Sequence, residues 1–137
     1  MNHQVIVDTG PLVALLNRSD HAHAWVMQTL PTIARPLITC EAVLAEASFI
    51  TRNLPGARAA LIEMVGEGFL SIGMQFADHH SAILAMIKRY TNVPMSLADA
   101  CLVRLAELHP QSYVMTLDSD FSVYRKNGRQ MIAVLRP

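Results

Sequence analysis

The stretch QVIVDTGPLVALLN, residues 4–17, sets the fold class of this chain of 137 residues. It opens with a β-branched run that ends at Asp8, and this pattern predicts a short strand buried on both faces. Thr9-Gly10 follows as a turn signal. Pro11 suits the first turn of a helix, where a missing N–H costs nothing. The stretch therefore predicts a buried strand that leads directly into a helix.

The same alternation of strand and helix continues to the end of the chain. Further strands are expected at 36–39, 69–72, 112–116 and 131–135. Helices are expected at about 21–30 with Asp20 as cap, at 41–54, 57–65 and 76–90, at 97–108 with Ser96 as cap, and near 119–125. This order predicts a single α/β domain over residues 1–137, with a mainly parallel five-stranded sheet flanked by helices.

Composition limits the classes of function. The chain is 52% hydrophobic and 16% charged, which is typical of a folded globule. Its 11 basic residues balance 11 acidic ones, which argues against a protein that coats nucleic acid but allows a nuclease that binds phosphate through metal ions. Cys40 and Cys101 form no CxxC pair, so they are expected to be core residues in a reduced, cytoplasmic setting. Neither a signal peptide nor a membrane span is expected.

Four carboxylates are predicted to meet at one edge of the sheet. Asp8 ends the first strand, and Asp118 follows the fourth strand by one residue. Asp99 lies in the first turn of the helix before the fourth strand, and Glu46 in the second turn of the helix after the second strand. If the strands are parallel, their carboxyl ends share an edge, which is where ligands bind in such sheets.

The residue types at this edge indicate a metal-dependent reaction. Each acid taken alone also has an ordinary role, as a helix cap, a complement to the helix dipole or a solvated flank. Together, however, they would repel one another and raise one another's pKa unless cations neutralised them. Oxygen ligands without His or Cys suit Mg²⁺ or Mn²⁺. Such a site favours metal-assisted hydrolysis of phosphodiesters.

The same residues resemble the motifs of a known family. The matching pieces are VIVDT at 5–9 followed by GPLVALLN at 10–17, TCEAVLAE at 39–46, SLADACLV at 96–103 and VMTLDSDF at 114–121. In order and spacing the chain resembles a PIN domain, specifically the VapC-type toxin ribonucleases. The resemblance covers nearly the whole chain. It implies a three-layer fold with sheet order 3-2-1-4-5 and a Mg²⁺- or Mn²⁺-dependent endoribonuclease.

The resemblance also implies a role for each acid. Asp8, Glu46, Asp99 and Asp118 would form the catalytic quartet. Asp8 and Asp99 would be the principal metal ligands, and Asp118 would bind directly or through water. Glu46 would hold a metal-bound water or a second ion.

Further residues would support this quartet. Thr9 and Thr116 would orient the carboxylates through their hydroxyls. Asp120 is a lesser acidic candidate whose other role is a helix cap. Gly10-Pro11 departs from the small polar residues that many relatives carry after Asp-Thr.

Partners follow from the same resemblance. RNA is the implied substrate, and Arg125, Lys126 and Arg129 form a basic cluster that could contact phosphates or merely be solvated. A cognate antitoxin protein and a homodimer are expected.

Three other functions stay open on the sequence alone. The first is a PIN nuclease that works without an antitoxin, and the second is an inactive interaction module. The third is an aspartic protease that uses Asp8-Thr9-Gly10, although such proteases consist almost wholly of strands.

Overall fold

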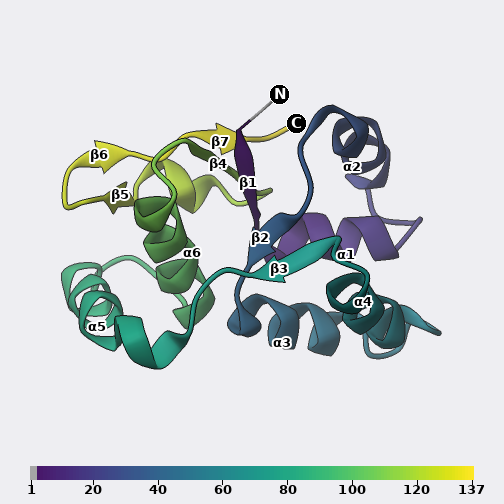
Figure 1. The fold of residues 1–137 in the computed structure, drawn as a ribbon, viewed down its shortest axis with the longest axis horizontal. Helices are drawn as coiled ribbons and strands as arrows, with labels where there is room; N and C mark the ends of the chain where they lie inside the picture. Colours follow the sequence, from purple (N-terminus) through teal and green to yellow (C-terminus); the bar gives the residue numbers. More distant parts are fainter. Residues whose placement is uncertain (1–2) are drawn as a thin grey trace.

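The fold is that of a computed structural model, which describes residues 3–137 (Figure 1). Its centre is a five-stranded sheet in the order β3-β2-β1-β4-β7, and every neighbouring pair is parallel. The strands are β1 (Gln4–Val7), β2 (Leu37–Thr39), β3 (Leu70–Ile72), β4 (Ser112–Met115) and β7 (Val134–Leu135). The predicted α/β class and strand order are confirmed.

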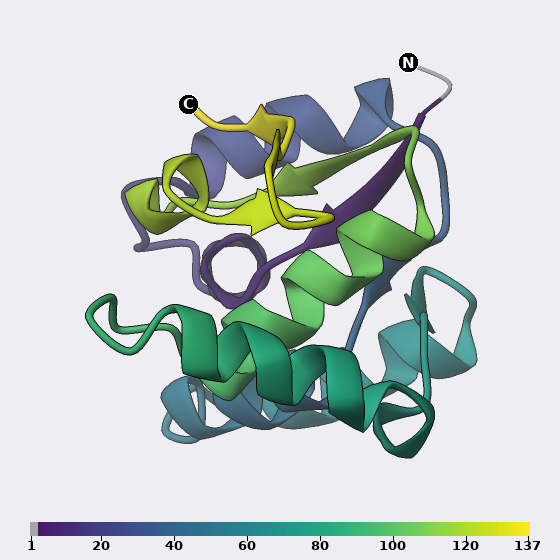
Figure 2. The same cartoon turned by 90° about the vertical axis from the view of Figure 1, so that its left-hand side faces the viewer.

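Helices flank this sheet on both sides. Figure 1 shows the sheet between α5 and α6 on the left and α1 to α4 on the right, and the turned view in Figure 2 has α6 crossing in front of the sheet. The helices are α1 (Thr9–Leu16), α2 (His23–Thr29), α3 (Glu41–Ile50), α4 (Ala57–Gly66), α5 (His80–Arg89) and α6 (Leu97–Leu108). Residues 3–137 also contain three 3₁₀ turns, η1 (Leu30–Thr32) after α2, η2 (Phe76–His79) before α5 and η3 (Ser119–Ser122) after β4. This layered parallel fold does not suit an aspartic protease. Within residues 3–137, no helix is both long and apolar enough to cross a membrane.

The core lies where the sheet meets α6. Val5, Ile6 and Val7 are buried along β1, as a strand covered on both faces requires. Most of α6 is also buried, including Leu102 and Leu105. Because β1 and β4 are parallel neighbours, their carboxyl ends lie together, and α6 begins close to them.

The end of the chain differs from the prediction. The expected strand at 131–135 is divided, because only β7 joins the main sheet. The strand β6 (Gln130–Met131) instead pairs antiparallel with β5 (Arg125–Lys126). Asn127 and Gly128 turn this hairpin with φ of 51° and 80°, which Asn and Gly adopt most easily. The Asn-Gly pair was a hairpin signal in the sequence that the helix-strand pattern obscured.

Several helices are also shorter than predicted. Asp20 does not cap α2, whose N-cap is Ala22. The Asp20 carboxylate instead accepts the N–H of Ala22 at 2.9 Å in the turn before α2. The helix α3 ends at Ile50, and the chain then turns before Pro55, which lacks the N–H that a longer helix needs. The helix expected at 119–125 is only η3.

Candidate active site

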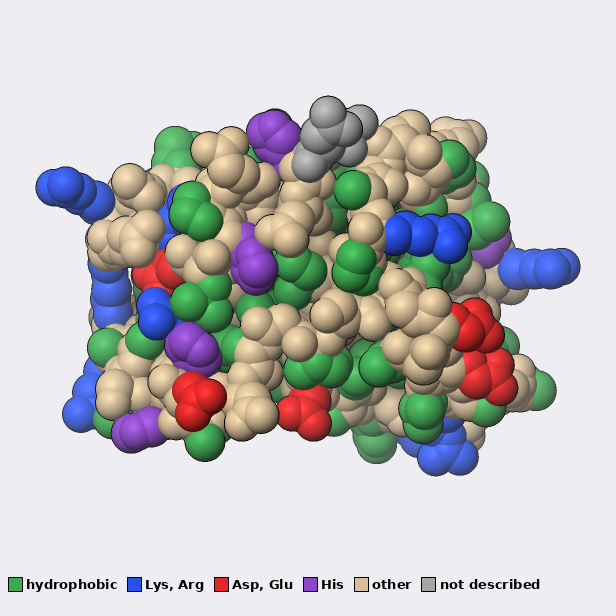
Figure 3. Space-filling model, viewed as in Figure 1, with side chains coloured by type: hydrophobic (Ala, Val, Ile, Leu, Met, Phe, Trp, Pro, Cys, Tyr) green, Lys and Arg blue, Asp and Glu red, His purple; other side chains and the backbone are tan. Residues whose placement is uncertain are grey.

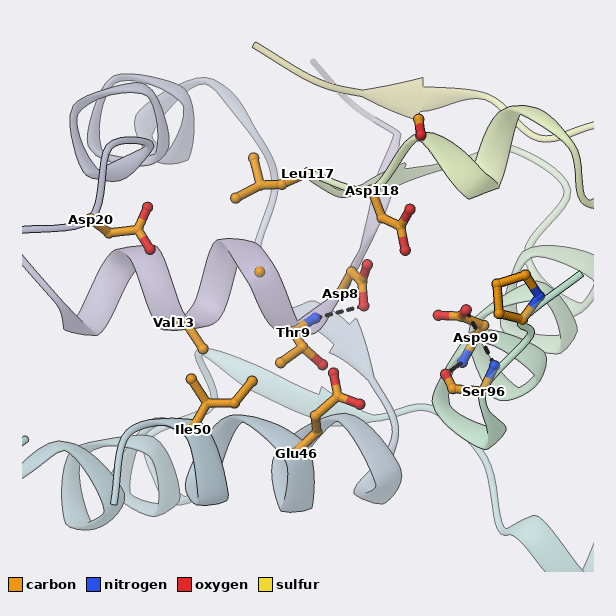
Figure 4. Close-up of a pocket in the computed structure, with 13 residues that line it drawn as sticks. Asp8, Thr9, Val13, Asp20, Glu46, Ile50, Ser96, Asp99, Leu117 and Asp118 are labelled. Atoms are coloured by element: carbon orange, nitrogen blue, oxygen red, sulfur yellow. Dashed lines mark hydrogen bonds between the residues drawn. The ribbon is translucent and has the colours of Figure 1, made fainter. Parts of the chain in front are cut away.

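A cleft of about 670 Å³ opens at the carboxyl ends of β1 and β4 (Figure 4). The strand ends, α1, α3 and the start of α6 all contribute to it. It is lined by Asp8, Thr9, Gly10, Val13, Asp20, Glu46, Ile50, Pro94, Ser96, Asp99, Leu117, Asp118 and Ser119. The four acids predicted to converge therefore line one cleft.

Asp8 is fixed at the floor of this cleft. It follows β1 directly, caps α1 and is only 7% exposed. One carboxylate oxygen accepts the N–H of Thr9 at 2.7 Å, and the other accepts the hydroxyl of Thr116 at 2.8 Å. The Thr116 hydroxyl also accepts the N–H of Asp118 at 2.9 Å. Thr116 thus connects the ends of β1 and β4, in line with the orienting role predicted for it.

Asp99 is held at the start of α6. The Ser96 hydroxyl accepts the N–H of Asp99 at 3.0 Å, and Asp99 accepts the N–H of Ser96 at 3.4 Å, which is a capping box. The fully buried Tyr124 donates its hydroxyl to the same carboxylate at 2.9 Å. Tyr124 was not among the predicted site residues, since it is 25 residues away from Asp99 in the chain and belongs to no motif.

Asp118 and Asp120 extend the acidic group on the loop after β4. The Asp118 carboxylate accepts the N–H of Asp120 at 2.9 Å. One oxygen each from Asp99, Asp118 and Asp120 lie within 4.8 Å of one another, close enough to share an ion. Asp120 therefore belongs with the candidate ligands, although the sequence analysis predicted a lesser role for it. Asp8 lies beside this trio with both oxygens already accepting hydrogen bonds.

Glu46 and Thr9 complete the cleft from the side of α1 and α3. Glu46 is exposed, and Figure 4 shows its carboxylate directed from α3 toward Thr9 and Asp8. The hydroxyl oxygen of Thr9 is buried and has no hydrogen-bond partner among residues 3–137. A buried polar atom without a partner is costly, so this hydroxyl is positioned for a ligand or water in the cleft.

Burial makes two carboxylates of this cleft, those of Asp8 and Asp99, hard to ionise. Desolvation raises the pKa of Asp8 from 3.8 to about 6, although its bonds from Thr116 and Thr9 oppose the shift and the charges of Asp99 and Asp118 add to it. Desolvation also raises the pKa of Asp99, against the lowering effect of the Tyr124 hydroxyl. A cation in the cleft would remove the main cost of keeping both groups charged.

Metal binding should depend on pH through Asp8. A proton and a cation compete for its carboxylate, so affinity is expected to rise with pH up to about 6 and then level off. One pH unit below that pKa, at pH 5, binding of Mn²⁺ should be roughly 10-fold weaker than at pH 7.5. Calorimetric titration with Mn²⁺ at four pH values measures this. Equal affinity at pH 5 and 7.5 would contradict a ligand role for Asp8.

The predicted RNA-contacting residues lie outside the cleft, on the β5–β6 hairpin. Arg125 donates to the backbone carbonyls of the three preceding residues at 2.8–3.1 Å. Lys126 reaches the carbonyl of Pro110 at 3.4 Å, and Arg129 is exposed. The structure joins this hairpin to the site through Tyr124, which precedes Arg125.

Comparison with known proteins places the chain in a family. The model of the PIN domain matches residues 5–127, and the chain belongs to the PIN domain family. It is similar to ribonuclease VapC26 of Mycobacterium tuberculosis (strain ATCC 25618 / H37Rv), with 25% identity over 134 residues, 96% of this chain and 99% of that protein. Its fold is similar to the crystal structure of Mycobacterium tuberculosis VapC20, a sarcin-ricin loop cleaving toxin. The TM-score is 0.78 at 20% identity, over 88% of this chain and 94% of the other.

Proposed function

We propose that this protein is a Mg²⁺- or Mn²⁺-dependent endoribonuclease and the toxin of a toxin–antitoxin pair. The observation that carries the proposal is the meeting of Asp8, Glu46, Asp99 and Asp118 in one cleft of a PIN domain. Similarity to ribonuclease VapC26 along nearly the full length of both chains supports RNA as the substrate. The fold alone would not, because one fold hosts many functions.

The donor set of the cleft fits a hard divalent cation. All its candidate ligands are oxygens, with no His or Cys among the lining residues. The raised pKa of Asp8 and the unpartnered hydroxyl of Thr9 both describe a site that a cation and its ligands would stabilise. Asp8, Asp99 and Asp118 would hold the ion, and Asp120 would join them, since one of its oxygens lies within 4.8 Å of oxygens of Asp99 and Asp118.

The chain's own residues would divide the work of hydrolysis. Mg²⁺ or Mn²⁺ in the cleft would make water more acidic and neutralise charge on the phosphate. Thr116 and the N–H of Thr9 keep the Asp8 carboxylate in one orientation. Tyr124 and Ser96 do the same for Asp99. Glu46, on the open side of the cleft, would orient the attacking water toward the phosphorus.

Cleavage assays test the proposed reaction. Purified protein should cut single-stranded RNA in the presence of Mg²⁺ or Mn²⁺, and EDTA should reduce cutting to the background of a no-enzyme control. Restoring either metal should restore cleavage, because the acids are preorganised by their hydrogen bonds and need no refolding. Cleavage that persists in EDTA would contradict the metal-dependent mechanism. An absence of cleavage with both metals would favour an inactive interaction module.

The partners of a toxin belong to the same proposal. We expect a cognate antitoxin, a homodimer and a cytoplasmic location. Apolar side chains that could serve such contacts are exposed on α3 and α4, where Phe49 is 65% and Ile62 is 71% exposed. A short upstream reading frame with a DNA-binding N-terminus would support the antitoxin.

A further inference from the structure

The positive charge of the chain gathers at one end of the molecule, although the net charge is zero. More than half of the 11 Lys and Arg residues lie on α5, α6 and the β5–β6 hairpin. They are Lys88, Arg89, Arg104, Arg125, Lys126 and Arg129. Figure 3 shows blue side chains grouped at the left end, over the position of α5 and the hairpin in Figure 1.

A second pocket, of about 320 Å³, lies between these three elements. Arg89 lines it from α5, Arg104 from α6 and Arg125 from the hairpin, and Glu107 is the only acid among the lining residues. Three guanidinium groups against one carboxylate leave the pocket with a net charge of about +2. It is separate from the acidic cleft, with which it shares no lining residue. We call it the arginine pocket.

Two of the three guanidinium groups of the arginine pocket are held in place by their neighbours. Arg104 donates to Glu107 at 3.0 Å and to the Nδ1 of His79 at 3.1 Å. Arg125 is anchored through one terminal nitrogen by backbone carbonyls, which leaves its positive charge uncompensated. Such fixed groups lose little conformational entropy when they bind an anion.

Arg89 makes the fewest polar contacts of the three arginines. Its guanidinium lies 5.4 Å from the centre of the Tyr90 ring, and it makes no hydrogen bond or ion pair within residues 3–137. A Cβ at Gly128 would stand 3.6 Å from the terminal nitrogen of Arg89, so the hairpin turn approaches this arginine closely. Arg89 can therefore donate its N–H groups to an anion in the pocket without breaking a hydrogen bond or an ion pair.

Two tyrosines connect the arginine pocket to the acidic cleft. The hydroxyl of Tyr90 accepts the N–H of Arg125 at 2.9 Å. The rings of Tyr90 and Tyr124 pack edge-to-face, with their centres 5.3 Å apart. Tyr124 in turn donates to Asp99 at 2.9 Å. Along α6, Arg104 and Asp99 are separated by about 7.5 Å, at 1.5 Å per residue. The pocket is thus within reach of an RNA strand of a few nucleotides that occupies the cleft.

We propose that the arginine pocket binds a backbone phosphate of RNA, a few nucleotides away from the bond that is cut. The inference rests on the proposed function in that RNA is the substrate. Guanidinium groups pair with phosphate through parallel N–H donors. A phosphate subsite outside the metal site lets a neutral chain hold RNA firmly while the acidic cleft, which repels phosphate, is filled by cations.

Binding of RNA oligonucleotides to the Asp8→Asn protein tests this subsite without cleavage. In this background, Arg89→Gln should weaken binding of a ten-nucleotide single-stranded RNA about 5–10-fold, measured by fluorescence anisotropy. It should also reduce the slope of log K against log salt by about 1, as the loss of one phosphate contact predicts. For a dinucleotide the weakening should be less than about twofold, because a ligand with a single phosphodiester cannot place a phosphate in both sites. Inorganic phosphate should compete with the longer RNA in the parent protein and less in Arg89→Gln.

Arg58→Gln is the matched control, since Arg58 is an exposed arginine on α4. It should leave affinity and salt slope unchanged. If Arg89→Gln and Arg58→Gln bind the ten-nucleotide RNA alike, or if binding of the dinucleotide is weakened as much as that of the longer RNA, the arginine pocket is not a phosphate subsite. Cleavage by the unmodified protein is measured separately. If the protein cleaves RNA but the binding results contradict the subsite, only the inference is overturned. If the binding results are as expected but the protein does not cleave RNA, only the proposed reaction is overturned.

Discussion

Replacing Asp8 with Asn is expected to abolish RNA cleavage while making the metal-free protein more stable. Activity should fall on the order of 10³-fold, because a metal contributes several kcal/mol to the stabilisation of charge in the transition state. Asn is a weaker ligand and carries no charge. Single-turnover cleavage at saturating Mn²⁺ measures the loss.

The gain in stability follows from the sign of the pKa shift at Asp8. The pKa of its carboxyl group rises from 3.8, the ordinary value for an aspartate, to about 6 in the fold, so the folded state holds the proton more tightly than the unfolded state does. The stability that this provides is present below pH 3.8 and is lost as pH rises through 6. At pH 7.5 the uncharged Asn avoids that cost. Its amide nitrogen cannot accept a hydrogen bond, so one of the two bonds that Asp8 accepts is lost, and a net gain of about 1–2 kcal/mol in the free energy of unfolding remains.

Thermal unfolding in EDTA checks the stability of Asp8→Asn, and Asp20→Asn is its control. Asp20 lines the same cleft, and its carboxylate accepts the backbone N–H of Ala22 and lies 3.6 Å from the Nδ1 of the exposed His21. We expect the control to cleave RNA normally. If the Asp8→Asn protein retains more than a tenth of the activity, Asp8 is not a metal ligand. A lower melting temperature at pH 7.5 would show that its hydrogen bonds outweigh the cost of burying its charge.

Replacing Asp120 with Asn is expected to weaken metal binding about 10–100-fold, the range found for groups that support metal ligands. The reason is the proximity of one of its oxygens to those of Asp99 and Asp118, all within 4.8 Å. Cleavage should fall at low Mn²⁺ and recover as Mn²⁺ is raised, because the other acids remain. Calorimetry gives the affinity, and cleavage against metal concentration gives the recovery.

Asp78→Asn controls for the change of charge, since Asp78 is exposed on η2. It should leave both measurements unchanged. If Asp120→Asn behaves like this control, Asp120 has only a structural role in η3. The ion would then be held by Asp8, Asp99 and Asp118 alone.

Local patterns predicted most of the fold because each element has its own signal. A β-branched run before Asp8 and the cap at Ser96 each specify a structure within a few residues. The parts that were wrong are those where two signals compete. At the end of the chain, an apolar run at 131–135 outweighed the Asn-Gly turn, and the hairpin that carries the arginine pocket was missed.

The sequence by itself determined the fold class, the strand order through its family motifs, and the four acids of the cleft, since the carboxyl ends of parallel strands must share an edge. Only the tertiary structure decided which side chains outside the motifs support those acids. Tyr124 donates a hydrogen bond to Asp99, and Arg89 lines one pocket with Arg104 and Arg125, because elements far apart in the chain pack together. No local spacing encodes such contacts, because they depend on how a helix, a hairpin and a sheet settle against one another.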